Sequence, residues 1–228
     1  MKIQMRKQRK LSSLGEFPLL VVVALLVSIF VKTFLVQFFY IPSGSMENTL
    51  QVNDRVGVNK IANFFGEIKR GEVVVFRDPA GWLPEPDPAS TGVIGKAKSA
   101  LVFAGILPNP AKQYLIKRVI GVGGDHIVCC DATHHLKINE TSIKEPYIFE
   151  GDRPSDTDFE VTVPKGFIWV MGDHRSASAD SRFHTDDPHK GMVPLSAVTG
   201  RATFVIWPLK NAKFLDVGKD LSKITATK

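Results

Sequence analysis

Cysteine is scarce in this sequence of 228 residues, and its two copies, Cys129 and Cys130, are neighbours. Adjacent cysteines cannot build a disulfide framework, and a bond between them closes a strained eight-membered ring. We therefore expect two apolar strand positions here. The chain also lacks repeats, and its 44% hydrophobic content excludes a disordered or collagen-like class. This length and composition suit one domain with a sizeable core and a small second lobe.

Most of the chain carries almost no net charge. The formal net charge is +6, but residues 1 to 41 hold six Lys or Arg and one Glu, which leaves 23 basic and 22 acidic residues elsewhere. The basicity thus belongs to the amino terminus, and we expect no nucleic-acid partner.

Long apolar runs are limited to residues 17 to 41, which Lys32 alone interrupts with a charge. About 20 apolar residues cross a hydrocarbon core, so this run predicts a single transmembrane anchor. Residues 1 to 16 form a basic flank that stays cytoplasmic, which places the rest of the chain outside the cell membrane. A cleaved signal peptide is the alternative, because Ser43 and Ser45 are small residues two apart. The run exceeds an ordinary signal-peptide core, which favours a retained anchor.

Beyond the anchor, short apolar segments bounded by turn formers predict a mainly β domain over residues 42 to 210. The expected strands cover residues 55–58, 72–77, 114–122, 127–131, 136–138, 167–171 and 202–207. Residues 79 to 113 predict a variable loop with a short helix at 93 to 107. A small inserted lobe is expected at about 130 to 165, and residues 211 to 228 form a polar tail.

Two hydroxyls follow the apolar run in the stretch Ile41-Pro42-Ser43-Gly44-Ser45-Met46. Pro42 restricts the backbone before the two hydroxyls, and Gly44 gives it conformational freedom between them. The loop can therefore present a hydroxyl oxygen at a fixed angle. Ser45 is therefore a candidate nucleophile at a membrane surface. A polar turn that leaves a helix is the alternative.

Lys117 lies in a segment whose alternation places it on one face with Leu115 and Val119. Burial between apolar neighbours disfavours the ammonium form, and a neutral amine can take a proton from a serine hydroxyl. A lysine that extends to water is the alternative.

A loop of small and polar residues follows the expected strand at 167 to 171. Its acids Asp173 and Asp180 can pair with Arg175 and Arg182 and fix the loop, which leaves Ser178 free to hydrogen-bond a buried amine. An ordinary salt-bridged turn is the alternative.

Histidines offer two competing sites. His174 suggests a Ser-His-Asp arrangement, and a carboxyl-terminal cluster suggests a metal. That cluster comprises His184, Asp186, Asp187 and His189. Its spacing matches no ligand pattern such as H-E-x-x-H, so we favour a solvated loop over a metal site.

Four segments in order behind an amino-terminal anchor resemble the successive boxes of bacterial type I signal peptidases, of actinobacterial type. The segments are residues 41–46, 71–76, 117–125 and 172–182. The resemblance reaches from the anchor to about Trp207. Asn48 and His174 depart from it, because proline and asparagine are common at these places.

The resemblance implies an antiparallel β-rich catalytic domain that takes its substrate as an added strand. Its substrates would be secretory preproteins, cut after small residues at positions −3 and −1, and the resemblance implies neither a metal nor a cofactor. The implied roles are Ser45 as nucleophile, Lys117 as general base, Ser43 and Ser45 as oxyanion hole, Ser178 as lysine-orienting residue, and Asp173 with Arg118 and Asp180 with Arg182 as structural pairs. A membrane-anchored β-rich binding module without catalysis is the alternative function.

Overall fold

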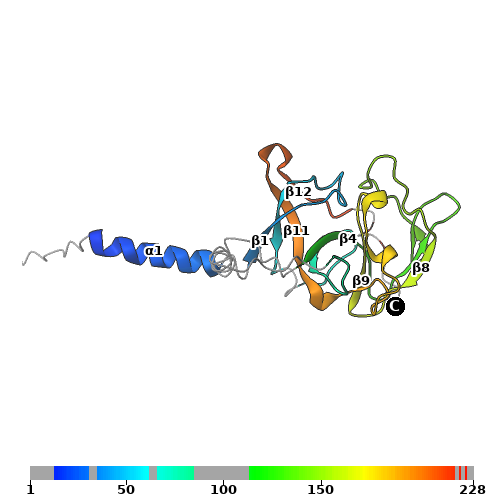
Figure 1. Ribbon diagram of the computed structural model, residues 1–228, viewed down its shortest axis with the longest axis horizontal. Helices are drawn as coiled ribbons and strands as arrows, with labels where there is room; N and C mark the ends of the chain where they lie inside the picture. The colour runs from blue at the N-terminus through cyan, green and yellow to red at the C-terminus, as the bar shows by residue number, and fades with distance from the viewer. Residues whose placement is uncertain are drawn as a thin grey trace, which may run out of the picture.

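The computed structural model describes residues 13–30, 35–61, 66–84, 113–218, 221 and 224. It consists of one α-helix, two β-sheets and several short 3-10 turns (Figure 1). In chain order the helix and strands are α1 (Ser13–Phe30), β1 (Val36–Tyr40), β2 (Arg55–Asn59), β3 (Val73–Arg77), β4 (Tyr114–Val122), β5 (His126–Cys129), β6 (Lys137–Ile138), β7 (Thr141–Ser142), β8 (Phe159–Thr162), β9 (Phe167–Met171), β10 (Val193–Pro194), β11 (Val198–Trp207) and β12 (Lys213–Phe214). The 3-10 turns are η2 (Arg175–Ala177), η3 (Ser181–Phe183), η4 (Leu195–Ala197) and η5 (Leu209–Asn211).

The larger sheet has the strand order β1-β2-β11-β3-β4-β9-β10, and β12 adds to β11. Its pairs are antiparallel throughout. Four of the five residues of β3 are buried, so both faces of this strand are covered. This burial explains why the sequence of β3 is a continuous apolar run. This packing makes β3 and its neighbour β4 the rigid centre of the sheet.

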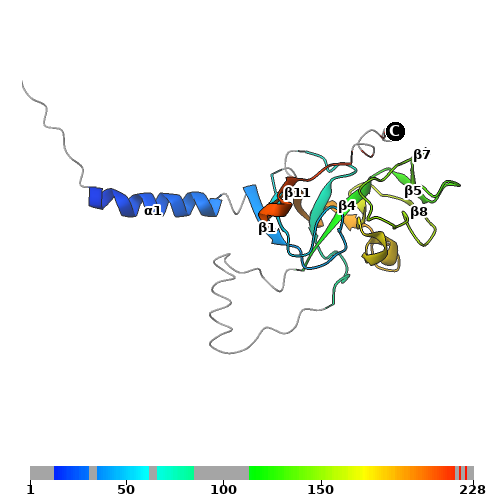
Figure 2. The same cartoon turned by 90° about the horizontal axis from the view of Figure 1, so that it is seen from above.

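The smaller sheet has the order β7-β6-β5-β8 and packs around a core that includes Ile127, Leu136 and Trp169. Figures 1 and 2 place β8 of this sheet at the end of the β domain opposite β1. Trp169 belongs to β9 of the larger sheet, so the two sheets share this core. The small lobe is therefore packed onto the sheet rather than tethered to it.

Each of the seven expected strands is present at approximately its predicted place, with β4 and β9 at the predicted residues, and the structure adds β1, β7, β8, β10 and β12. β11 begins four residues earlier than predicted and reaches from Val198 to Trp207. The short helix expected at residues 93 to 107 lies outside the described residues.

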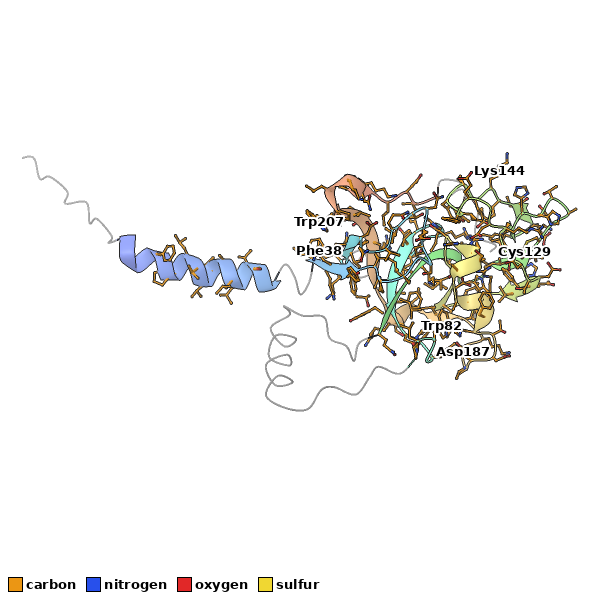
Figure 3. The ribbon with its side chains drawn as sticks, turned by 45° about the horizontal axis from the view of Figure 1, so that its top comes forward. Phe38, Trp82, Cys129, Lys144, Asp187 and Trp207 are labelled. Carbon is orange, nitrogen blue, oxygen red and sulfur yellow. A yellow bond between two sulfur atoms is a disulfide. The ribbon has the colours of Figure 1, made fainter. Side chains whose placement is uncertain are left out.

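The expectation for the two cysteines is wrong. They form a vicinal disulfide at the end of β5 (Figure 3). Cys129 is buried in the core of the small lobe, and Cys130 packs against the same core. Both cysteines therefore contact the same core cluster rather than lying on opposite faces of a continuing strand.

The apolar run from residues 17 to 41 divides between two kinds of structure. The described helix ends at Phe30, and residues 36 to 40 form β1, which pairs with β2 from Val36 opposite Asn59 to Tyr40 opposite Arg55. The carboxyl end of the expected anchor is thus a sheet strand. Within the described part of the chain, no helix is both long and apolar enough to cross a membrane.

Candidate active site

The turn that carries Ser45 is fixed from both sides. Before it, Ile41 donates a backbone hydrogen bond to Asp54 O at 2.9 Å. After it, Leu50 N donates to Met46 O at 2.7 Å, and the side chains of Met46 and Leu50 are completely buried in the sheet core. The apolar residues that follow Ser45 therefore anchor the turn.

Lys117 lies in the middle of β4, opposite Val74 of β3. Its Nζ is 2.6 Å from Ser45 Oγ, and the two residues are 4% and 7% exposed. The structure thus brings together two side chains separated by 72 positions of sequence. A buried amine in contact with a buried hydroxyl has the geometry of a base and its nucleophile.

Burial lowers the pKa of Lys117 to about 8, from an ordinary value of 10.5. The carboxylates of Asp180 and Asp173 oppose this effect, because negative charge favours the ammonium, while the guanidinium of Arg182 adds to it. Desolvation is the largest of these influences. A substantial share of the lysine is therefore neutral near pH 8.

Gly172, in the loop after β9, lies close to Ser45. A Cβ added at Gly172 would lie 2.4 Å from Ser45 O and 2.3 Å from Ser178 Oγ, so only glycine fits here. Ser178 is buried, and its hydroxyl donates to Asp180 Oδ2 at 2.8 Å. Within the part of the chain that the structure describes, no hydrogen bond joins Ser178 to Lys117, so its orienting role stays a prediction.

Asp173 and Arg118 form the expected pair in a fully buried position. Arg118 Nε and Nη2 donate to the two carboxylate oxygens of Asp173 at 2.8 and 2.7 Å. The guanidinium also donates to Gly71 O at 2.6 Å and to Asp216 O at 3.1 Å, and Thr49 donates to the same carboxylate. This bidentate pair connects β4, the nucleophile turn and the carboxyl-terminal segment.

Asp180 and Arg182 also pair as expected, with Nε–Oδ1 and Nη2–Oδ2 distances of 2.9 Å. Asp180 Oδ2 accepts from the backbone N–H of Gly172 as well, at 2.9 Å. Because Gly172 contacts Ser45, this carboxylate fixes the loop against the nucleophile.

The two expected oxyanion donors have no hydrogen-bond acceptor among the described residues. Ser43 is exposed, and neither its hydroxyl nor the Ser45 N–H donates a hydrogen bond to any described residue. Free donors beside the Ser45 hydroxyl are what a developing oxyanion requires.

The histidines are not arranged as a catalytic triad or a metal site. His174 Nδ1 contacts Gly44 O and Glu47 Oε2, at 3.3 and 3.2 Å, rather than Ser45 Oγ. His184 stacks on Trp82 with ring centroids 4.4 Å apart, and Asp187 accepts from the Trp82 indole at 2.8 Å. Among the residues that the structure describes, no group of His, Cys, Asp or Glu could hold a metal ion.

Sequence reasoning missed a polar connection between the small lobe and the site. Arg175 pairs with buried Glu145 at 2.6 Å, and the Arg118 guanidinium lies 4.1 Å over the Tyr147 ring. Asn48, one of the two departures, has φ +80 and donates to the carbonyls of Tyr147 and Ile148. Proline cannot adopt this φ, so an asparagine here is consistent with the turn.

Together, the antiparallel sheet and the buried Ser45–Lys117 contact define a chain of the hydrolase class with a serine and an amine at its centre. The model of the signal peptidase family, peptidase S26, matches residues 14–207, so the chain belongs to this family. Membership makes it a peptidase of the signal peptidase type.

Two relatives with similar sequences agree with this membership. A probable signal peptidase I from Mycobacterium leprae is 37% identical over 90% of this chain and 80% of the relative. Signal peptidase I from Mycobacterium tuberculosis is 39% identical over 87% of this chain and 74% of the relative. A crystal structure of a signal peptidase I from Enterococcus faecalis matches 60% of this chain and 97% of that one, at 24% identity and a TM-score of 0.37.

Proposed function

We propose that this chain is a membrane-anchored serine endopeptidase that removes signal peptides from secreted preproteins with a Ser45–Lys117 dyad. One observation carries the proposal: a buried amine, with its pKa lowered to about 8, lies 2.6 Å from a buried serine hydroxyl. Membership in the signal peptidase family supplies the substrate class.

In the acylation step, neutral Lys117 Nζ takes the proton of the Ser45 hydroxyl while Oγ attacks the carbonyl carbon of the scissile bond. The carbonyl oxygen becomes an oxyanion that accepts from the Ser45 N–H and the Ser43 hydroxyl. The C–N bond then breaks, and the leaving amine takes the proton from Lys117. Ser45 is left as an ester of the signal peptide.

Deacylation repeats this sequence with water. Lys117, neutral again, takes a proton from a water molecule, and the hydroxide attacks the ester carbonyl. Collapse of the second oxyanion expels Ser45 Oγ, which recovers its proton from the lysine. Fixed support favours both steps, because Asp180 and Asp173 hold the loop and the strand on either side of the dyad.

The preferred substrates carry small residues at positions −3 and −1, and they bind as an added strand beside residues 42 to 44. The exposure of Pro42 and Ser43 supports this placement, because it leaves the segment before the nucleophile open.

The bilayer is the second proposed partner. The amino terminus lies in the cytoplasm, the apolar run that begins at residue 17 anchors the chain in the cell membrane as a single span, and the catalytic domain is extracytoplasmic. Exposed apolar side chains support this placement, because they gather at the end of the sheet that follows α1 in sequence: Phe38, Tyr40, Trp207, Leu209 and Phe214. Figure 3 shows Phe38 and Trp207 near each other at this end, far from Cys129.

The test is cleavage of a purified preprotein by the full chain in detergent, followed by amino-terminal sequencing of the product. Ser45→Ala and Lys117→Met should each abolish cleavage, whereas Lys165→Met, at an exposed lysine, should not. Persistent processing by Lys117→Met would refute the dyad.

The same assay separates the rival functions. Exhaustive chelation should leave cleavage intact, and loss of activity would indicate a metal hydrolase. Binding of the preprotein without any cleavage by the wild-type chain would indicate a binding module. If His174→Ala lost all cleavage with Lys117 present and the fold intact, a Ser-His mechanism would replace the proposed one.

A further inference from the structure

The peptide unit between Gly44 and Ser45 is held by one residue from outside the turn. Gly44 O accepts a hydrogen bond from Glu47 N at 2.9 Å and lies 3.3 Å from His174 Nδ1. The backbone N–H of His174 also donates to Ser45 O, at 3.2 Å. His174 therefore contacts the carbonyl groups on both sides of the serine.

The position of the imidazole proton follows from its neighbours. Nδ1 faces a backbone carbonyl and a carboxylate oxygen, Glu47 Oε2 at 3.2 Å, and both are acceptors. Nδ1 must therefore carry the proton, whether the ring is neutral or charged.

The ring itself is fixed in place. Phe149 stacks on it with centroids 4.0 Å apart and an angle of 17° between the planes. Phe149 N donates to Asp173 O at 2.9 Å, and Asn48 holds the carbonyl of the preceding residue, Ile148, at 3.0 Å. The His174 side chain is only 17% exposed, so it has little freedom to leave Gly44.

A trans peptide unit is planar, and its C=O and N–H point in opposite directions. A donor that fixes Gly44 O therefore also fixes the direction of the Ser45 N–H. It also polarises the amide, which strengthens the N–H as a donor.

We propose that His174 is a positioning residue that orients and polarises the Ser45 N–H as an oxyanion donor, by donating from Nδ1 to Gly44 O. This inference rests on the proposed function. It assigns a role to one of the two places where the sequence departs from the signal peptidase boxes.

The test compares three substitutions in the full chain, with preprotein cleavage resolved into kcat and KM. The Asn amide nitrogen is attached to Cγ, as Nδ1 is, so His174→Asn can donate to Gly44 O. The Gln amide lies one carbon farther out, and Phe keeps only the stacking on Phe149. An exposed histidine, His134→Gln, serves as the control.

We expect His174→Gln and His174→Phe to lower kcat by about tenfold or more, with little change in KM, because an oxyanion donor acts mainly in the transition state. This loss of about tenfold corresponds to one hydrogen bond of this kind. His174→Asn keeps a donor for Gly44 O, so its kcat should lie within about threefold of wild type. Melting temperatures are measured for each variant.

Several results would overturn the inference. They are wild-type kcat in His174→Gln and His174→Phe, a change confined to KM, and a folded His174→Asn as impaired as His174→Gln. Ser45→Ala and Lys117→Met are assayed alongside: if either retains cleavage, the proposed function fails, whereas their inactivity beside fully active His174 variants removes this inference alone.

Discussion

The lowered pKa of Lys117 makes the pH dependence of cleavage the sharpest test of the dyad. The perturbation is a change of pH from 6 to 10.5, and the quantity measured is kcat/KM, which reports the ionisation of the free enzyme. Only the neutral amine can accept the serine proton. Activity should therefore rise as Lys117 loses its proton.

The magnitude follows from the pKa of about 8. The neutral fraction is then about 10% at pH 7 and about 90% at pH 9, so kcat/KM should rise about tenfold between them and level above pH 9. With an ordinary pKa of 10.5, the rise over the same interval would be about a hundredfold and would continue beyond pH 9. The two cases differ by a factor of about ten, which a rate assay resolves easily.

The assay uses an amino-capped peptide without His, Cys, Lys or Tyr, so that the substrate does not titrate, and product is separated by chromatography. Lys117→Arg is the control, because a guanidinium stays protonated over this range and the variant should be inactive throughout. A midpoint near 6.5, or a slope that continues past pH 10, would refute the reasoning that burial prepares this lysine as the base.

Three further predictions concern stability and packing. Folding lowers the pKa of Lys117, so below pH 8 burial of the ammonium costs up to about 3 kcal/mol of folding stability. This cost fades between pH 8 and 10.5, because the unfolded chain then binds more protons than the folded chain. Lys117→Met should therefore raise the melting temperature at pH 7. Gly172→Ala should abolish cleavage and cost about 1–3 kcal/mol in urea denaturation, because its Cβ would lie 2.4 Å from Ser45 O. Arg175→Met should cost about 3–5 kcal/mol in the same experiment, since it leaves buried Glu145 unpaired.

Each of these has a result that would contradict it. A melting temperature for Lys117→Met below that of wild type at both pH 7 and pH 10 would mean that the lysine stabilises the fold. Full activity in Gly172→Ala would show that the loop can move away from the serine. An Arg175→Met variant as stable as wild type would mean that the lobe does not depend on this ion pair.

Much of the fold and of the candidate site could be predicted, because it depends on local sequence patterns. Alternation along β4 indicated that Lys117 shares a face with apolar residues, and the structure buries it. The acids and bases after β9 indicated pairs within the loop, and Asp180 pairs with Arg182 two positions away. Such features depend on neighbours a few positions apart.

Other features depend on groups distant in sequence, and local patterns could not predict them. Glu145 and Tyr147 lie in a mixed polar stretch with no periodicity, yet they contact Arg175 and Arg118. The end of the apolar run was assigned to the membrane because composition does not separate a span from a strand such as β1. The sequence pattern could not predict the disulfide of Cys129, because two adjacent cysteines are equally compatible with apolar positions in a strand.

The position of β11 has a consequence for the order of events during synthesis. This strand comes late in the chain but lies between β2 and β3, so the sheet that presents Lys117 to Ser45 is incomplete until about residue 207 has emerged from the ribosome. Arg118 then gains its last partner at Asp216 O. A nascent copy thus contains both Ser45 and Lys117 before the sheet that brings them together is complete.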